Sequence, residues 1–192
     1  HGADVVVHST TKYLGGHSDV IGGAVVTNDE ELATRVKFFQ FAVGAIPGPL
    51  DCYLVMRGIR TLGVRMDRHQ ENAARVVELL ASHDEIARVW YPGLETHPNH
   101  KIAHVQMSGY GGMVSVEAKG GAARAKQIVE KTRIFTLAES LGGVESLIEL
   151  PAAMTHLSTS GSLLEVPSNL IRLSVGIEDV NDLLDDLRQA LA

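Results

Sequence analysis

The stretch "HSTTKYLGGHSD", residues 8–19, sets a lysine between hydroxyl side chains and glycines, directly after a run of valines. The valines predict a short buried strand over residues 4–7. Ser9 and Thr11 carry hydroxyl groups that can bind a phosphate together with backbone N–H groups near a strand end. The glycines that follow allow another backbone or a ligand to approach closely. The stretch therefore predicts a phosphate-binding turn with Lys12 beside the anion.

Lys12 has two chemical uses in such a turn. Its ammonium can hold a phosphate as a point charge, or a partly desolvated neutral amine can form a Schiff base with a carbonyl. A nucleotide-binding P-loop is disfavoured, because in that motif the lysine follows the glycines, whereas here Lys12 precedes them. A solvated surface amine is the common case for lysines in general. The local pattern alone leaves these interpretations open.

Composition limits the classes of function. The chain has 192 residues, of which 45% are hydrophobic, and a formal net charge of −6. This hydrophobic content predicts a globular chain with one substantial core or two small ones. The negative charge and the lack of a basic run disfavour a nucleic-acid or anionic-membrane surface. The single cysteine, Cys52, cannot form an internal disulfide, which fits a reducing compartment, and we expect the cytoplasm.

Helical and strand patterns alternate along the chain, which predicts an α/β fold. After the first strand, further strands are expected at 21–28, 86–90, 112–118 and 170–175. Asn28 is expected to cap a helix, with Glu31 in the capping-box position, and Asp51 to cap a long helix. A short helix follows the strand at 86–90, a helix containing Ala125, Ile128 and Val129 follows the strand at 112–118, and a final helix has one apolar stripe made of Val180, Leu183, Leu184, Leu187 and Leu191. In the strand at 170–175, Arg172 and Ser174 share one face and the aliphatic residues share the other.

Five stretches together resemble the Cys/Met metabolism (trans-sulfuration) family of pyridoxal-phosphate-dependent enzymes. They are "GADVVVHSTTKYLGGHSDVIGGAVV" (2–26), "AVGAIPGPLDCYLVMRGIRTL" (42–62), "YPGLETHPNH" (91–100), "LAESLGGVESLIELPAAMTH" (137–156) and "LIRLSVGIED" (170–179). The resemblance covers essentially the whole chain. It implies fold type I, the aspartate-aminotransferase type, with residues 1–60 completing the large cofactor domain and residues 61–192 forming the small C-terminal α/β domain.

The resemblance also implies a cofactor and its ligands. Lys12 would carry pyridoxal 5'-phosphate as a Schiff base, and Ser9 and Thr11 would bind the phosphate. Other cofactor contacts of the family would lie in an N-terminal half, so we expect an upstream portion to be missing. We also expect the family's homotetramer, with active sites shared between subunits.

Four further residues acquire substrate roles by resemblance. Arg172 would bind the α-carboxylate of an amino-acid substrate through two parallel charged hydrogen bonds, and Ser140 would orient the lysine and that carboxylate. Glu139 would pair with the second ammonium of a substrate such as cystathionine, and Thr155 would line the same side. Considered alone, Arg172 fits a solvated sheet face and Ser140 an ordinary glycine turn.

The implied activity is γ-replacement or γ-elimination at cystathionine or an O-acylhomoserine, as in cystathionine γ-synthase and γ-lyase. A methionine γ-lyase-like activity is the alternative within the family. Outside it, a non-catalytic phosphate- or nucleotide-binding module and a noncatalytic dimerisation piece stay open.

The histidines do not predict a metal site. His97, His100 and His104 have helical spacing, but Pro98 precludes a helix that includes all three, and no H-E-x-x-H pattern occurs. A hydrogen-bonded loop residue explains His17.

Overall fold

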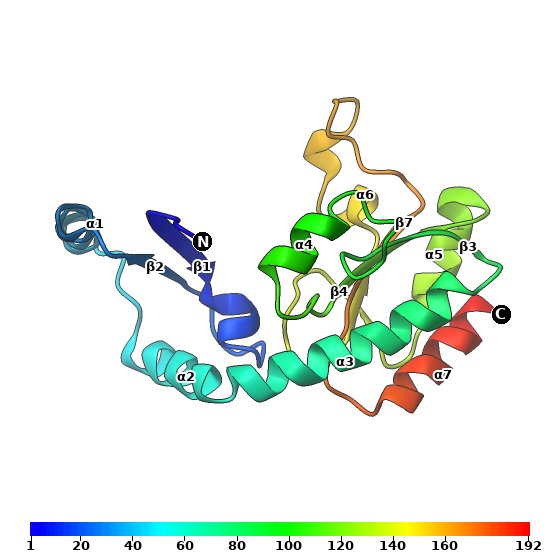
Figure 1. The fold of residues 1–192 in the computed structure, drawn as a ribbon, viewed down its shortest axis with the longest axis horizontal. Coiled ribbons are helices and arrows are strands. Elements are labelled where there is room, and N and C mark those ends of the chain that lie inside the picture. The colour runs from blue at the N-terminus through cyan, green and yellow to red at the C-terminus, as the bar shows by residue number, and fades with distance from the viewer. The chain divides into compact units, whose positions relative to one another are not determined.

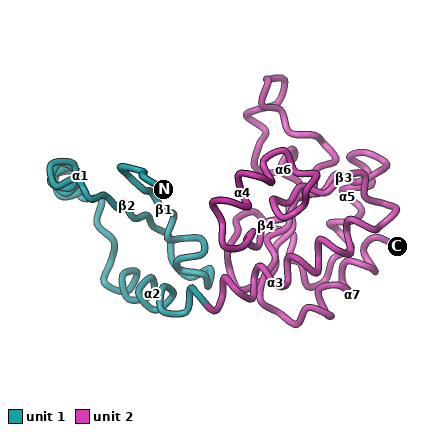
Figure 2. The backbone as a smooth tube through the Cα atoms, viewed as in Figure 1, with its two compact units in different colours: residues 1–63 teal, residues 64–192 magenta.

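The computed structural model describes residues 1–192, which form two compact units, His1–Gly63 and Val64–Ala192 (Figures 1 and 2). The first unit contains β1 (Val5–Ser9), the π-type turn η1 (Thr10–Leu14), β2 (Gly23–Thr27), α1 (Glu30–Val43) and α2 (Pro49–Arg60). The chain continues along α3 (Leu62–Ala81). The elements of the second unit are then β3 (Ile86–Trp90), α4 (His100–Gln106), β4 (Met113–Ala118), α5 (Gly121–Lys131), β5 (Thr136–Leu137), β6 (Leu147–Glu149), α6 (Pro151–Met154), the 3-10 turn η2 (Leu157–Thr159), β7 (Leu170–Ser174) and α7 (Val180–Leu191). The predicted α/β class is confirmed.

The second unit is built on a five-stranded sheet with strand order β3-β4-β7-β6-β5. β5 and β6 are parallel, and every other pair is antiparallel. Apolar residues of α3, α5 and α7 form one core with the inward-facing residues of the strands. In β7, Ile171 and Leu173 belong to this core, so Arg172 and Ser174 lie on the opposite face, as the alternation predicts.

The predicted stripe of α7 is confirmed. Leu183, Leu184, Leu187 and Leu191 are all buried in the core. The Asp179 carboxylate accepts a hydrogen bond from Asn181 N at 2.8 Å and caps the helix. Burying each leucine contributes about 1.5–3 kcal/mol, so this stripe fixes the helix on the sheet.

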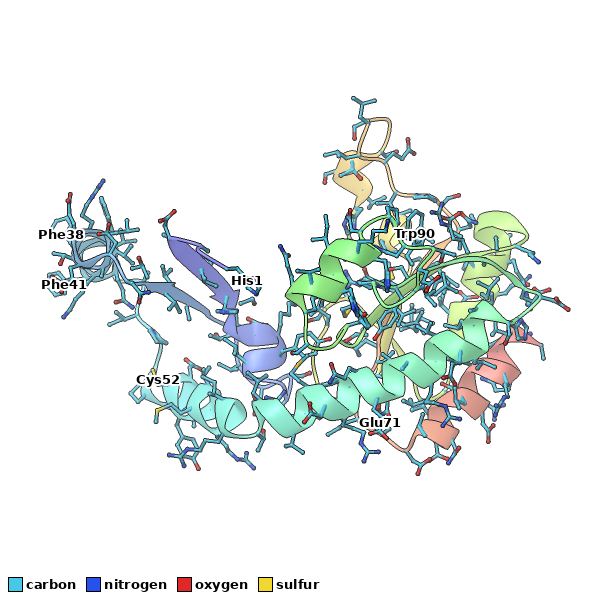
Figure 3. All side chains as sticks on the ribbon, viewed as in Figure 1. His1, Phe38, Phe41, Cys52, Glu71 and Trp90 are labelled. Carbon is cyan, nitrogen blue, oxygen red and sulfur yellow. The ribbon has the colours of Figure 1, made fainter.

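The first unit has a two-stranded antiparallel sheet, with Val5 opposite Thr27 and Ser9 opposite Gly23. The prediction that the first strand is buried is wrong for this chain, because all five residues of β1 are exposed and only β2 pairs with it. α1 likewise has no buried residue, and Phe38 and Phe41 project from it into solvent (Figure 3). Several apolar side chains of this unit are therefore exposed to solvent.

Both predicted helix caps are wrong by one to three residues. Asp29, not Asn28, caps α1, because Asp29 is the last extended residue and its carboxylate accepts from Leu32 N at 2.8 Å. The cap residue of α2 is Gly48. Asp51 lies inside the first turn and accepts the Gly48 N–H at 3.1 Å. Asn28 and Asp29 are adjacent and both residue types cap helices, so the sequence does not separate them, and Gly48 has no side chain that would mark it as a cap.

The predicted long helix is interrupted at Thr61. This residue has φ −108° and ψ 4°, and its hydroxyl donates to Gly58 O at 3.2 Å, so α2 ends at Arg60 and α3 begins at Leu62.

None of the helices is both long enough and apolar enough to cross a membrane.

Candidate functional site

Lys12 lies in η1, the tight turn that follows β1. Its φ of −91° and ψ of −133° depart from helical values, and the side chain is half-buried. Two backbone hydrogen bonds close the turn around it, from Gly15 N to Thr10 O at 2.9 Å and from Gly16 N to Lys12 O at 2.8 Å. The backbone that carries the amine is therefore fixed on both sides.

Thr11 ties this turn to the start of β2. Its hydroxyl oxygen accepts the Gly22 N–H at 3.0 Å, and Thr10 N donates to Gly22 O at 2.9 Å. The Ser9 side chain, at the end of β1, is exposed. Of the two residues predicted to bind phosphate, Ser9 thus directly precedes the turn that holds Lys12, and Thr11 lies within it.

The turn also has the form of a cradle that a larger residue would fill. A Cβ at Gly22 would come within 2.8 Å of Thr10 Oγ1, and one at Gly15 would come within 2.7 Å of Thr10 O and Val20 Cγ1. Hydroxyl groups, exposed glycine backbone at Gly22 and an amine are the donor set that a phosphate and an aldehyde require. The residues present therefore fit pyridoxal 5'-phosphate.

A cavity of about 560 Å³ adjoins this turn within the first unit. It is lined by Thr10, Gly22 and Gly23 and by residues of α2, among them Cys52 and Met56. Lys12 is not among the lining residues. The cavity is therefore next to the lysine turn and not around the amine.

Gly58 of α2 is buried against the same turn. A Cβ at this position would fall on the carbonyl oxygens of Leu14 and Gly15. Because these are backbone atoms, the turn itself would have to move to admit a side chain. The helix and the lysine turn are therefore packed at the distance that only glycine permits.

Replacing Gly58 with alanine is expected to lower the free energy of unfolding of the full-length protein by about 1–3 kcal/mol, as overpacking does. Urea unfolding measures the change. Gly63→Ala is the matched control, because no atom lies within 4 Å of a Cβ there, and this change is expected to stabilise α3 by up to about 1 kcal/mol. Equal effects of the two substitutions would contradict this packing.

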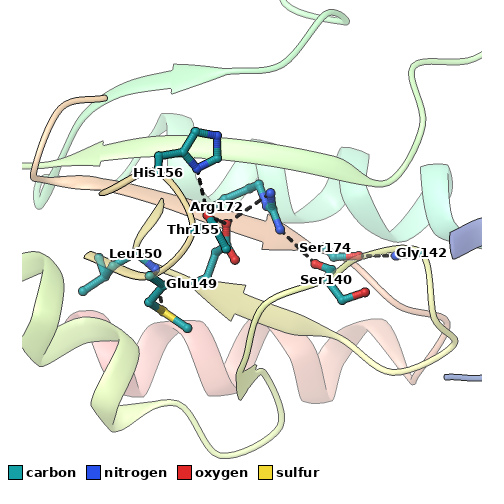
Figure 4. Close-up of polar contacts among 9 residues, drawn as sticks. Ser140, Gly142, Glu149, Leu150, Thr155, His156, Arg172 and Ser174 are labelled. Atoms are coloured by element: carbon teal, nitrogen blue, oxygen red, sulfur yellow. Dashed lines mark hydrogen bonds and ion pairs between the residues drawn. The ribbon is translucent and has the colours of Figure 1, made fainter. Parts of the chain in front are cut away.

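A second group of predicted residues meets in the second unit, around Arg172 (Figure 4). Arg172 Nη1 forms an ion pair with Glu149 Oε1 at 3.1 Å, and Arg172 Nη2 donates to Ser140 O at 2.9 Å. Ser140 has a φ of 87°, a left-handed conformation that costs a non-glycine residue energy. The strained backbone directs its carbonyl to the guanidinium.

Thr155 joins this group through Glu149. Its hydroxyl donates to Glu149 Oε1 at 3.2 Å, and its oxygen lies 2.8 Å from His156 Nδ1. Glu139 is exposed next to Ser140, and its carboxylate forms none of these bonds. The structure therefore brings Ser140, Thr155 and Arg172 together and leaves Glu139 exposed beside them.

Sequence reasoning missed Glu149 and Ser174. The Ser174 hydroxyl accepts the Gly142 N–H at 2.9 Å, which fixes the loop that follows Ser140. A signal for Glu149 existed, because a carboxylate within the apolar run "LIEL" (147–150) indicates a buried charge that needs a partner.

A buried polar network holds the end of β7, the strand that carries Arg172. His69 of α3 donates from Nδ1 to Val175 O at 2.7 Å, and Asn72 Nδ2 donates to Gly176 O at 3.0 Å. Burial lowers the pKa of His69 below the ordinary 6.5, and the nearby positive charge of Arg65 acts in the same direction. Because the Val175 carbonyl oxygen can only accept, Nδ1 of His69 carries a proton in this bond.

The other histidines have local partners. His17 Nδ1 lies 2.8 Å from Gly15 O, which confirms a hydrogen-bonded loop residue. His100 and His104 stack on α4 with ring centroids 6.0 Å apart, whereas His97 precedes the helix and its ring lies edge-on to Trp90. No group of three or more histidine, cysteine or acidic residues has the geometry of a metal site.

The α/β fold is that of fold type I pyridoxal-phosphate-dependent enzymes. The sequence profile of the family described as "Cys/Met metabolism PLP-dependent enzyme" matches residues 1–192. The chain belongs to this family.

Individual relatives agree with this assignment. The chain is 64% identical over 190 residues to cystathionine gamma-synthase of Mycobacterium tuberculosis and 52% identical over 193 residues to cystathionine gamma-lyase of Dictyostelium discoideum. Each match includes 99% of this chain, and 49% and 50% of the two relatives. The crystal structure of metB from Corynebacterium glutamicum matches with a TM-score of 0.97 and 56% identity, over 99% of this chain and 49% of that one. The chain thus spans about half the length of the relatives it matches.

Proposed function

We propose that the whole protein is a pyridoxal-phosphate-dependent trans-sulfuration enzyme that catalyses γ-replacement or γ-elimination at cystathionine or an O-acylhomoserine. The observation that carries the proposal is the lysine turn around Lys12, in a chain of the Cys/Met metabolism family. The higher identity to a γ-synthase, 64% against 52% for a γ-lyase, favours γ-replacement.

Lys12 is proposed to carry the cofactor covalently, with Ser9 and Thr11 as phosphate ligands. When bound, pyridoxal 5'-phosphate supplies an electron sink for carbanion chemistry. The amine of Lys12 moves protons at the substrate's Cα and Cβ atoms as general base and acid. The hydrogen-bonded backbone of the turn fixes the Cα atom from which this side chain extends, and its flexible stem lets the amine reach both carbon atoms.

Arg172 is proposed to bind the α-carboxylate of the amino-acid substrate, and Ser140 is proposed to orient Lys12 and that carboxylate. A planar guanidinium suits this task because it donates two parallel hydrogen bonds to one carboxylate. Glu139, exposed beside Ser140, is proposed to pair with the distal ammonium of cystathionine, which methionine lacks. Thr155 is proposed to line the same side of the substrate site as Glu139.

Three further proposals concern the domains, the compartment and the assembly of the protein. Residues 1–60 belong to the large cofactor domain and residues 61–192 form the small C-terminal domain. The enzyme is a cytoplasmic homotetramer whose active sites are shared between subunits. The exposed apolar side chains of α1, such as Phe38 and Phe41, support burial of this surface in the complete protein.

Comparison of two substrates tests the activity. We expect the full-length holoenzyme to form cystathionine from O-succinylhomoserine and cysteine at a kcat/KM at least about tenfold higher than its kcat/KM for cystathionine breakdown. Faster breakdown of cystathionine would assign a lyase. Preference for methionine would favour the methionine γ-lyase-like alternative, and anion binding without any covalent cofactor adduct would favour a phosphate- or nucleotide-binding module.

A further inference from the structure

Glu149 is placed beside Arg172 by the register of the sheet. The two residues are directly opposite each other in the antiparallel pair β6-β7, and Ser115 of β4 is opposite Arg172 on its other side. Directly opposite residues of antiparallel strands have side chains on the same face, with Cβ atoms about 4.5–5.5 Å apart. The contact between carboxylate and guanidinium is therefore built into the pairing of two adjacent strands, β6 and β7, and does not depend on a loop.

The two charged groups differ in their burial. The Glu149 side chain is 1% exposed, whereas the Arg172 side chain is 22% exposed. The carboxylate therefore lies behind the guanidinium, and solvent or a ligand reaches Arg172 from the other side. This arrangement fits a carboxylate that supports the arginine and does not itself contact a ligand.

Two contacts hold the guanidinium group. Glu149 Oε1 accepts from Nη1 and Ser140 O accepts from Nη2. A guanidinium has five N–H donors, so these two bonds leave donors for a substrate carboxylate. An arginine side chain has many rotamers, and holding it in one of them beforehand lowers the entropy cost of ligand binding.

Thr155 also binds the Glu149 carboxylate oxygen that pairs with Arg172. Its hydroxyl donates to Glu149 Oε1, the atom that pairs with Arg172, while the buried Oε2 has no hydrogen-bond partner. A buried carboxylate with one unpartnered oxygen is costly to keep. Because only Oε1 has partners, we infer that the carboxylate is kept for the contact that Oε1 makes with Arg172.

We propose that Glu149 is a positioning residue that sets the rotamer of Arg172 and thereby the affinity for the α-carboxylate of the amino-acid substrate. The inference rests on the proposed role of Arg172 in carboxylate binding.

Steady-state kinetics of the full-length holoenzyme test this role. Glu149→Gln removes the charge at constant size, and Glu149→Asp keeps the charge but withdraws it by one methylene. Each is expected to raise the KM for the amino-acid substrate about tenfold while kcat changes less than about threefold. A merely structural residue predicts the opposite split, because partial unfolding lowers the amount of active enzyme and hence kcat, but leaves KM unchanged. An unchanged KM, with or without a lower kcat, would overturn the proposal.

Two comparisons identify the cause of a failure. Glu85→Gln is the matched control, because Glu85 pairs with Arg124 at 2.6 Å in the same unit, and its KM is expected to equal that of the wild type. If Arg172→Lys raises KM but Glu149→Gln does not, only the positioning role is wrong. If neither raises KM, the proposed carboxylate-binding role of Arg172 is wrong as well.

Discussion

Replacing Lys12 with alanine is expected to lower kcat/KM of the full-length enzyme by at least about 10³-fold, since a positioned acid–base group alone contributes 10²–10⁴-fold. The substitution removes the amine that is proposed to carry the cofactor and to move protons at the substrate. The backbone of the turn is held by the hydrogen bonds of Thr10, Gly15 and Gly16. We therefore expect the free energy of unfolding to change by only about 1 kcal/mol.

Lys126→Ala is the control for this prediction. Lys126 is an exposed lysine of α5 that pairs with Glu130 at 3.7 Å, and its removal is expected to leave kcat/KM unchanged. Turnover by the Lys12→Ala variant at more than a tenth of the wild-type rate would contradict the proposed role. Unfolding curves of both variants show whether a loss of activity is a loss of fold.

The second large effect is expected for Arg172→Lys, with a rise in KM for the amino-acid substrate of about 10–10²-fold and a smaller change in kcat. A lysine keeps one positive charge but cannot make two parallel hydrogen bonds to a carboxylate. It also cannot contact Glu149 Oε1 and Ser140 O with the fork geometry that the arginine uses. Steady-state kinetics with saturating second substrate measure the effect.

Arg124→Lys is the matched control, because Arg124 also pairs with a glutamate, Glu85, in the same unit. This control is expected to alter neither kinetic constant. Wild-type kinetics for Arg172→Lys would mean that another group binds the substrate carboxylate.

Elements with strong local periodicity were predictable from the sequence. The stripe of α7, the buried residues of α5 and the alternation along β7 all follow from spacing within one element. Features that depend on a single residue's backbone were not predicted, such as the cap at Asp29 and the break at Thr61. The predicted burial of β1 was wrong because burial depends on which other elements pack on a strand, and the sequence of the strand itself does not show this.

In the candidate site too, the residues close together in sequence were predictable, and a contact between distant residues was not. Ser9, Thr11 and Lys12 lie within four consecutive residues, so the local pattern indicated a phosphate-binding turn. The family resemblance supplied the covalent role of the lysine. Glu149 and Arg172 are 23 positions apart in the sequence and meet only through strand register. β6 has three residues, too few for an alternating pattern to indicate its register.

The most direct test of the central claim is the chemical identity of the cofactor-bearing residue. Full-length protein is incubated with pyridoxal 5'-phosphate, reduced with borohydride and digested, and the labelled peptide is sequenced by mass spectrometry. We predict loss of the visible absorption band on reduction and a pyridoxyl group on Lys12. A label on another lysine, or no stable label, would contradict the account.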